Sequence, residues 1–379
     1  MAAPKRKHSN LAPFAVGLAV GAGLFSVRNY LGRQHPNELP DQKRINRALD
    51  RALRQARKNR TIQLAANHRY IFFSDHHKGS GDAADDFRNC KETYLAALDD
   101  YNQRGFTLVI LGDGEELWED TIVRVLATYP DVFAAEQRFY PERYLRLIGN
   151  HDNAWESEAN IRIYLDDYFP GIQVYKSLVM NYQDGPETSG EIFFAHGHQG
   201  TVDADVFGFI PPLVLPFYRQ VQNITGLGHT NPSRDECLRG DHDTMMYRWA
   251  SRQGKLLFIA GHTHRPVWSS RTHLEKLLWQ YTSLLQISLD QRPADYEQQL
   301  AWLKAAINER EAKNPPCNDT IKTRPCYFNT GCCRYEDGDI TGIELEDGEL
   351  RLIKWGKLSG EIERTELEKT RLSEIFAIL

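Results

Sequence analysis

The sequence predicts an α/β fold, because short apolar runs suited to buried strands recur along the chain between segments of helical periodicity. Four of these runs are continuous and one is interrupted by an arginine; they are residues 70–73, 108–111, 192–195, 256–260 and, with the arginine, 144–148. A short cluster of polar residues follows each run at once. Because an open α/β sheet places its site at the carboxyl ends of its strands, we expect the five clusters to form one site.

The clusters offer oxygen and imidazole donors but no serine or cysteine nucleophile. In sequence they are DHH at 75–77, GD at 112–113, GNHD at 149–152, HGH at 196–198 and GHTH at 261–264. In the first and the last cluster two candidate ligands stand two residues apart, so both point to the same side of an extended strand end. Asp113 lies on the turn after a strand, where a carboxylate suits a bridge between two cations.

Seven side chains are therefore candidate metal ligands: Asp75, His77, Asp113, Asn150, His196, His262 and His264. Two carboxylates, one amide and four imidazoles suit transition metals better than Ca²⁺ or Mg²⁺, whose sites favour oxygen. We expect two divalent ions, with Mn first and Fe, Zn or Ni as alternatives. A single histidine or Gly-Asp pair is more often a structural or turn residue, so the ordered set carries the argument.

His151 stands next to a candidate ligand and is the candidate general acid, with Asp152 expected to orient it. Such an acid is useful where the leaving oxygen is a poor leaving group. His76 and His198 are the remaining histidines of the clusters, and we expect them to support ligands or face substrate.

These motifs resemble those of the calcineurin-like metallophosphoesterases, which run D-x-H, GD-x-x-D/E, GNH-D/E, HG and GH-x-H. The resemblance spans about residues 68 to 355 and implies a four-layer αββα sandwich, here with helical insertions and a basic N-terminal helix. It implies one metal bound by Asp75, His77, Asp113 and His264, and a second by Asp113, Asn150, His196 and His262. The segment 329–331 is similar to the family's later Asn-Pro-Gly turn near the site.

The resemblance implies a metal-dependent phosphoesterase that hydrolyses a phosphate ester through attack by a hydroxide bound to two metals. Glu116-Leu117-Trp118 and the His-Arg-Pro at 264–266 also resemble the UDP-2,3-diacylglucosamine pyrophosphatase branch, so a nucleotide or lipid pyrophosphatase is the alternative. That branch has Arg where this chain has His151, and Asp where it has His198. A membrane-tethered scaffold without activity is a remote alternative, and the complete ligand set argues against it.

Charge divides the chain unevenly. Residues 1–60 hold 13 Lys and Arg against 3 Asp and Glu, whereas the remainder holds 33 against 48. An acidic body does not suit nucleic-acid binding, so we expect no nucleic-acid partner. The basic N-terminal part suits an anionic membrane surface, and the substrate is expected to be a phosphate ester, lipid-like or nucleotide.

The N-terminal region, residues 1–40, contains a charge-free segment at 11–27. Seventeen residues are the lower limit for a membrane-spanning helix. A membrane anchor, a signal peptide without a clear cleavage site and an interfacial tail are the alternatives. We expect membrane association through this segment, with the rest of the chain cytoplasmic.

The basic helix is expected at 41–61, where Ile45, Leu49 and Leu53 recur every four residues. It either packs on the body or lies on anionic lipid. The catalytic domain follows at 62–379, with insertions at about 201–250 and 270–320. In the first insertion, the aromatic run at 206–218 is either a packed loop or a cap that meets an apolar substrate.

The second insertion has the spacing of helices near 272–286 and 295–313. A hairpin is expected from 340–345 and 350–355, followed by a final helix from about 361 to 377. The six cysteines lack the paired spacing of a zinc site. Reduced, buried thiols are expected, with a disulfide of Cys317 as the alternative.

Overall fold

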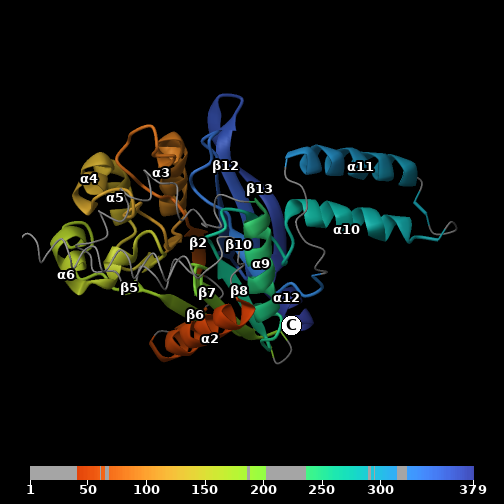
Figure 1. The fold of residues 1–379 in the computed structure, drawn as a ribbon, viewed down its shortest axis with the longest axis horizontal. Helices are drawn as coiled ribbons and strands as arrows, with labels where there is room; N and C mark the ends of the chain where they lie inside the picture. The colour runs from red at the N-terminus through yellow and green to blue at the C-terminus, as the bar shows by residue number, and fades with distance from the viewer. Residues whose placement is uncertain are drawn as a thin grey trace, which may run out of the picture. The chain divides into compact units, whose positions relative to one another are not determined.

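The computed structural model describes residues 41–59, 61–64, 68–185, 188–201, 236–288, 292–293, 295–313 and 322–379. In this part of the chain two β-sheets pack face to face and helices cover their outer faces (Figure 1). The predicted αββα sandwich is thereby confirmed. The region 1–40 with its apolar segment and the aromatic run at 206–218 lie outside the described residues. No described helix has the length and apolar content needed to cross a membrane.

The two sheets contain seven and six strands. The seven-stranded sheet has the order β13-β12-β11-β2-β3-β4-β5, with β2 Arg69–Phe73, β3 Thr107–Leu111, β4 Tyr144–Leu147, β5 Val174–Tyr175, β11 Ile340–Glu346, β12 Glu349–Leu358 and β13 Glu361–Arg371. The six-stranded sheet has the order β1-β6-β7-β8-β10-β9, with β1 Thr61–Gln63, β6 Ser177–Tyr182, β7 Gly190–Ala195, β8 Leu256–Ala260, β9 Pro266–Val267 and β10 Tyr327–Thr330. Because β2, β3 and β4 are parallel, and so are β7, β8 and β10, the loops that follow them leave the same edge of each sheet.

Alternate side chains of the central strands build two separate cores. On β2, Phe72 points between the sheets and stacks on Phe194 of β7 with 4.7 Å between ring centroids. The adjacent Phe73 points the other way and packs against Tyr94 of helix α3 (Phe87–Gln103). A strand covered on both faces needs apolar residues at every position, which is why these strands are continuous apolar runs.

Helices form the two outer layers. The seven-stranded sheet is covered by α3, α4 (Ile122–Thr128), α5 (Pro130–Gln137) and the short turns η1 (Asn153–Glu156), α6 (Glu158–Asn160) and η2 (Ile161–Leu165). The six-stranded sheet is covered by α2 (Gln42–Asn59) and α9 (Glu236–Ala250). The buried face of α2, with Ile45, Leu49 and Leu53, packs against Val179 and Phe193.

The second insertion contains two helices at the predicted positions, α10 (His273–Leu285) and α11 (Tyr296–Lys313). They pack on each other through a small core of their own, which includes Leu277, Leu284, Leu303 and Ile307. Thr272 begins α10: its hydroxyl accepts from the N–H of Glu275, and the Glu275 carboxylate accepts from the N–H of Thr272. This reciprocal cap fixes where the helix starts.

The hairpin predicted near the C-terminus is confirmed, with β11 paired antiparallel to β12. Its turn residues Asp347 and Gly348 have φ angles of 53° and 74°. Two consecutive left-handed residues give a turn whose twist matches that of the strands.

The final helix predicted from 361 to 377 is wrong over most of its length. Residues Glu361–Arg371 form β13, which pairs antiparallel with β12, and only Leu372–Ile378 is helical, as α12. Ser359 and Gly360 have φ angles of 53° and 94° and form a second two-residue turn. The Glu- and Lys-rich segment favours a helix by local propensity, but pairing along the edge of β12 outweighs that preference.

Four cysteines of the described chain, Cys90, Cys326, Cys332 and Cys333, are free and buried. Burial raises the pKa of the Cys90 and Cys332 thiols to about 12. These side chains therefore behave as small apolar groups, as predicted. Cys317, the candidate for a disulfide, lies outside the described residues.

A buried network of charges lies beneath the strand ends. The Lys78 ammonium is 2.7 Å from Glu136 and 3.2 Å from Glu115. Arg146 pairs with Glu115, which also accepts a 2.8 Å hydrogen bond from the Trp155 indole. The four charged side chains are fully buried. Because a buried charge is costly without a partner, the network fixes β4, α5 and the loops after β2 and β3 against one another.

Lys78→Met should lower the free energy of unfolding by about 3–5 kcal/mol, because it leaves the buried Glu136 carboxylate without its cation. The control is Lys176→Met, which removes an exposed ion pair of the same 2.7 Å length with Glu156. That variant should lose at most about 1 kcal/mol. Chemical denaturation measures both changes, and similarly small losses would contradict the role given to the network.

Candidate metal centre

The seven candidate ligands lie in loops at the carboxyl ends of parallel strands from both sheets. The loop after β2 carries two of them, the loops after β3, β4 and β7 carry one each, and the loop after β8 carries two: Asp75, His77, Asp113, Asn150, His196, His262 and His264. All are buried, with 0% to 9% of their surface exposed. The fold thus gathers polar groups from distant parts of the sequence into one buried place.

The first group of ligand atoms consists of Asp75, His77 and His264. The His264 Nε2 atom lies 3.1 Å from Asp75 Oδ1 and 3.2 Å from His77 Nε2. A close approach of carboxylate and imidazole donors in one buried cluster is typical of ligands that share a cation.

The second group consists of Asp113, His196 and His262. Asp113 Oδ2 lies 2.9 Å from His196 Nε2 and 3.6 Å from His77 Nε2, a member of the first group. One carboxylate therefore reaches both groups, which is the position that a bridging ligand requires.

The donor atoms fit divalent metal ions. Among the described residues, four buried atoms of the set form no hydrogen bond: Asn150 Oδ1, His262 Nε2, and the facing pair Asp113 Oδ2 and His196 Nε2, which lie 2.9 Å apart without hydrogen-bond geometry. Buried polar atoms are normally satisfied, and three of these residues, Asp113, His196 and His262, converge in the second group, so the unpaired atoms indicate a ligand. The other ring nitrogens of two histidines are already engaged, His77 Nδ1 by Glu116 at 2.9 Å and His196 Nδ1 by the Leu111 carbonyl at 2.8 Å. Both rings thereby turn Nε2 inward.

Five of the candidate ligands have a left-handed backbone. Their φ angles lie between 50° and 71°, and they are Asp75, His77, Asp113, His262 and His264. Such a conformation costs about 1–3 kcal/mol for a residue with a side chain and persists only where the surroundings enforce it. The strain turns each side chain sharply off its strand and into the site.

Close contact among three loops requires a glycine at position 112. A Cβ atom there would lie 2.7 Å from the Gly149 nitrogen and 2.8 Å from the His196 ring. The glycine, itself at a φ of 91°, lets the loops after β3, β4 and β7 meet around Asp113. The His151 N–H then donates to Asp113 Oδ1 at 2.8 Å.

His151 is held by Glu116 and not, as predicted, by Asp152. The Glu116 carboxylate accepts from the Nδ1 atom of His151 at 2.8 Å and from His77. The Trp118 ring stacks on the imidazole with 4.0 Å between centroids. Asp152 instead accepts from the backbone N–H groups of Gly114 and Gly149, at 2.9 and 2.7 Å.

The two remaining motif histidines differ in position. His76 is buried in the outer core, 4.6 Å between ring centroids from Tyr94, so the expectation that it supports a ligand or faces substrate is wrong. Its ring also packs against Phe87 of α3, with 5.9 Å between ring centroids. His198 lies beside the second group, with its ring 5.4 Å from that of His196.

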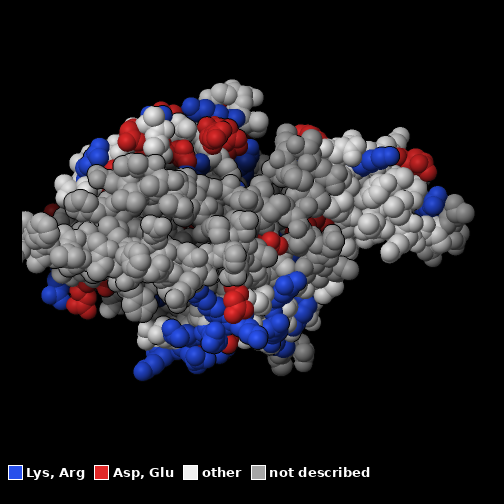
Figure 2. Space-filling view, viewed as in Figure 1, with Lys and Arg blue, Asp and Glu red and all other residues white. Residues whose placement is uncertain are grey.

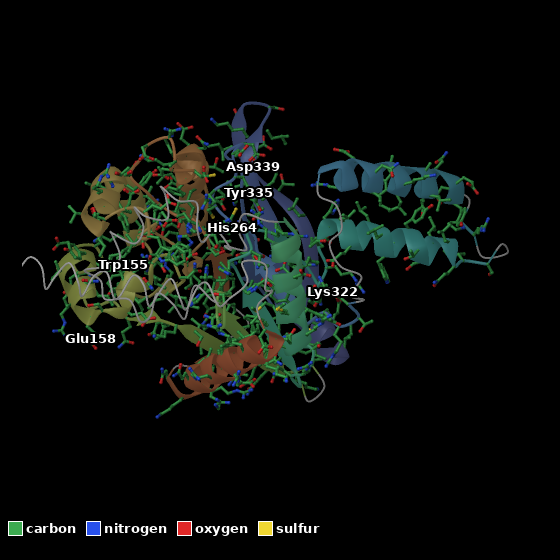
Figure 3. The ribbon with its side chains drawn as sticks, viewed as in Figure 1. Trp155, Glu158, His264, Lys322, Tyr335 and Asp339 are labelled. Carbon is green, nitrogen blue, oxygen red and sulfur yellow. The ribbon has the colours of Figure 1, made fainter. Side chains whose placement is uncertain are left out.

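Three supporting residues lie outside the ligand motifs. Asn329, in the expected late turn, donates to the Gly261 carbonyl and to Thr263, and so holds the loop of His262. His242 on α9 contacts the Gly197 carbonyl at 2.8 Å. Tyr335 donates to the His264 carbonyl at 3.4 Å, and Figure 3 shows these two residues near each other. A single histidine or tyrosine forms no motif, so the roles of His242 and Tyr335 could not be predicted from the sequence.

A sequence model of the calcineurin-like phosphoesterases matches residues 68–266, which is more than half of the chain. The protein belongs to the calcineurin-like phosphoesterase family. The matched span contains all seven candidate ligands, together with Glu116 and His151.

Solved structures are also matched, among them two of low sequence identity. Vacuolar protein sorting 29 of Cryptosporidium parvum is 9% identical, with 80% of this chain and 98% of that chain covered and a TM-score of 0.30. A single mutant of Vps29 from Entamoeba histolytica is 13% identical, with 79% and 99% covered and a TM-score of 0.29. No curated protein matches the sequence.

The charges of the candidate metal centre compensate one another even without metal. Burial raises the pKa of Asp75 and Asp113, but the neighbouring imidazoles outweigh it and hold both pKa values well below the usual range. Burial lowers the pKa of His77 and His196, but the carboxylates beside them outweigh it. They raise the pKa of His77 to about 9 and that of His196 to about 10.

Metal loading should therefore release about two protons per chain at pH 7.5, because a ligating imidazole must be neutral. The raised pKa values stabilise the metal-free fold fully below pH 6.5, and that stabilisation is lost as the pH rises through 9 and 10. Apparent metal affinity should thus increase from pH 6.5 to 9. Calorimetry in buffers of different ionisation enthalpy counts the protons, with His77→Gln as the control that releases one fewer. Heats that do not depend on the buffer would contradict this account.

Proposed function

We propose that this protein is a metal-dependent phosphoesterase that hydrolyses a phosphate ester. The observation that carries the proposal is the position of Asp113, whose carboxylate reaches His196 at 2.9 Å and His77 at 3.6 Å and so joins the two ligand groups. When bound, two divalent cations supply positive charge to a phosphoryl group and activate water for in-line attack. The mixed imidazole and oxygen donors favour Mn²⁺, with Fe, Zn or Ni as alternatives.

Side chains of the protein contribute to the reaction in two further ways, by excluding water and by donating a proton. The buried donors exclude bulk water from the reacting group, which strengthens each electrostatic contact there. His151 lies within reach of His77 and Asp113 in one cluster. Because the Glu116 carboxylate accepts from the Nδ1–H group of His151, the imidazolium form of His151 donates its second proton, from Nε2, to the leaving oxygen and becomes a neutral imidazole.

A proton donor favours an ester over a pyrophosphate as the substrate. Phosphate leaves readily without protonation, whereas an alkoxide does not. The Glu-Leu-Trp segment that resembles the pyrophosphatase branch supports the alternative of a nucleotide or lipid pyrophosphatase. In this chain, however, Glu116 and Trp118 both contact His151, the residue that departs from that branch.

Asp113→Ala should abolish turnover while the fold is retained, because it removes the carboxylate common to both ligand groups. Full-length protein, stripped of metal and reloaded with Mn²⁺, is assayed on a chromogenic phosphodiester, a phosphomonoester and UDP-diacylglucosamine. Turnover of the simple esters supports the proposal, and selective cleavage of the nucleotide-lipid supports the alternative. Wild-type activity in Asp113→Ala would contradict a two-metal mechanism, and silence on all substrates with metal bound would favour a scaffold.

His151→Gln should affect substrates according to their leaving group. Hydrolysis of an alkyl phosphate ester should fall by about 10²–10⁴-fold, the usual contribution of a general acid. A 4-nitrophenyl ester, which leaves without protonation, should be hydrolysed nearly as fast as by the wild type. Trp118→Phe is the control, since it keeps a ring on the imidazole. Equal losses on both substrates would argue against His151 as the acid.

A further inference from the structure

Helix α2 has two opposite faces, one apolar and buried and the other charged and exposed. Its apolar face, with Ile45, Leu49, Leu53 and Ala56, is buried against the six-stranded sheet. The Ser177 hydroxyl also donates to the Ala52 carbonyl, and Trp249 donates to Asp50 at 2.9 Å. The helix is therefore fixed to the body, and its outward face is rigidly presented.

The outward face carries a line of positive charge. Five cations recur at intervals of three or four residues and so share one side of the helix: Lys43, Arg47, Arg51, Arg54 and Lys58. All five are exposed, and none forms an ion pair with an acidic residue in the part of the chain that the structure describes. Of the helix's neighbouring cations, Arg57 is the one paired with Glu191. Figure 2 shows the resulting band of Lys and Arg over α2.

We propose that this cationic face, Lys43 to Lys58, binds the surface of an anionic lipid bilayer. At 1.5 Å per residue the row is about 22 Å long, and it lies straight along one helix. A straight row of charges matches a flat surface of lipid headgroups at every position. Each Lys or Arg near such a surface adds to the attraction.

Two observations favour a bilayer over nucleic acid. Helix α2 contains no aromatic residue, and aromatic stacking is the usual means of binding single strands. The chain beyond residue 60 has 33 Lys and Arg against 48 Asp and Glu, so a polyanion that wraps around the body is repelled.

The sequence before α2 supports the same partner. The charge-free segment 11–27 ends fourteen residues before the helix begins at Gln42. Fourteen residues span at most about 50 Å when extended, so an apolar segment held at a bilayer keeps α2 within reach of the same surface. Two weak membrane attachments on one chain together bind more tightly than either does alone.

Binding through this face is electrostatic and without insertion, because the apolar side of α2 is already occupied. It therefore depends on lipid charge and on salt, since the screening length falls from about 8 Å at 0.15 M to about 3 Å at 1 M ionic strength. Membrane binding through the apolar segment 11–27 should depend less on lipid charge and on salt. The two contributions are thus separable in the full chain.

The test compares full-length proteins on vesicles of phosphatidylcholine alone and with 30 mol% phosphatidylglycerol, by co-sedimentation. The quadruple variant K43Q/R47Q/R51Q/R54Q should lose roughly 100-fold or more of the partition that anionic lipid adds, from the usual effect of four cations near such a surface. The matched control, R124Q/R162Q/K176Q/K357Q, changes net charge equally at exposed cations that already have acidic partners. It should keep the preference for anionic lipid.

Two further outcomes would overturn the proposal. One is an equal loss in both quadruple variants, which would mean that net charge matters and α2 does not. The other is loss of binding to a DNA or RNA duplex while vesicle binding is unchanged. Turnover of a soluble chromogenic ester should be the same in both variants, so failure here is distinct from failure of the proposed phosphoesterase.

A second measurement applies even if every variant stays bound through its N-terminus. Amine-reactive acetylation of the wild type, read by mass spectrometry, reports whether a lysine is covered. Lys43 and Lys58 should be protected by the anionic vesicles and exposed with phosphatidylcholine alone, while Lys369 on β13 stays reactive with both. Unchanged reactivity of all three would place α2 away from the bilayer.

Discussion

Two buried carboxylates, Asp75 and Asp113, set the conditions that the rest of the site meets. An isolated buried anion costs several kcal/mol unless charge and hydrogen bonds compensate it. Here Asp75 accepts from the His262 N–H at 2.9 Å, and Asp113 accepts from the His151 N–H at 2.8 Å. The surrounding imidazoles supply the positive charge. Because all these groups lie on loops, the site exists only if the sheets hold the ends of five strands, β2, β3, β4, β7 and β8, in register.

The sandwich supplies that rigidity in two ways. Between the sheets, apolar packing such as that of Phe72 on Phe194 fixes one set of strand ends against the other. Beneath the site, Arg146 lies between Glu115 and Asp152, and Asp152 joins the loop of Asp113, through Gly114, to the loop after β4, through Gly149. The left-handed backbone of five candidate ligands is unfavourable and persists only where a rigid structure enforces it. Structural charge and candidate ligands thus form one continuous network.

The candidate ligands could be predicted from the sequence because each follows an apolar run in a fixed order of motifs. The helices α10 and α11 could also be predicted, from the periodic spacing of their apolar residues. The partner of His151 was not, since Asp152 is its chain neighbour while Glu116 reaches it only through the turn after β3. Likewise β13 is a strand because it pairs with β12, and such pairing cannot be predicted from the local composition of the segment. His76 and His242 show that a histidine's environment, not its presence, decides its role.

The most direct test of the central claim is a crystal structure of the Mn²⁺-loaded protein, with an anomalous difference map collected near the manganese edge. The account predicts two peaks, one among Asp75, His77 and His264 and the other among Asn150, His196 and His262, with Asp113 touching both. A single peak, or peaks away from these residues, would contradict the claim that the two ligand groups form one metal pair.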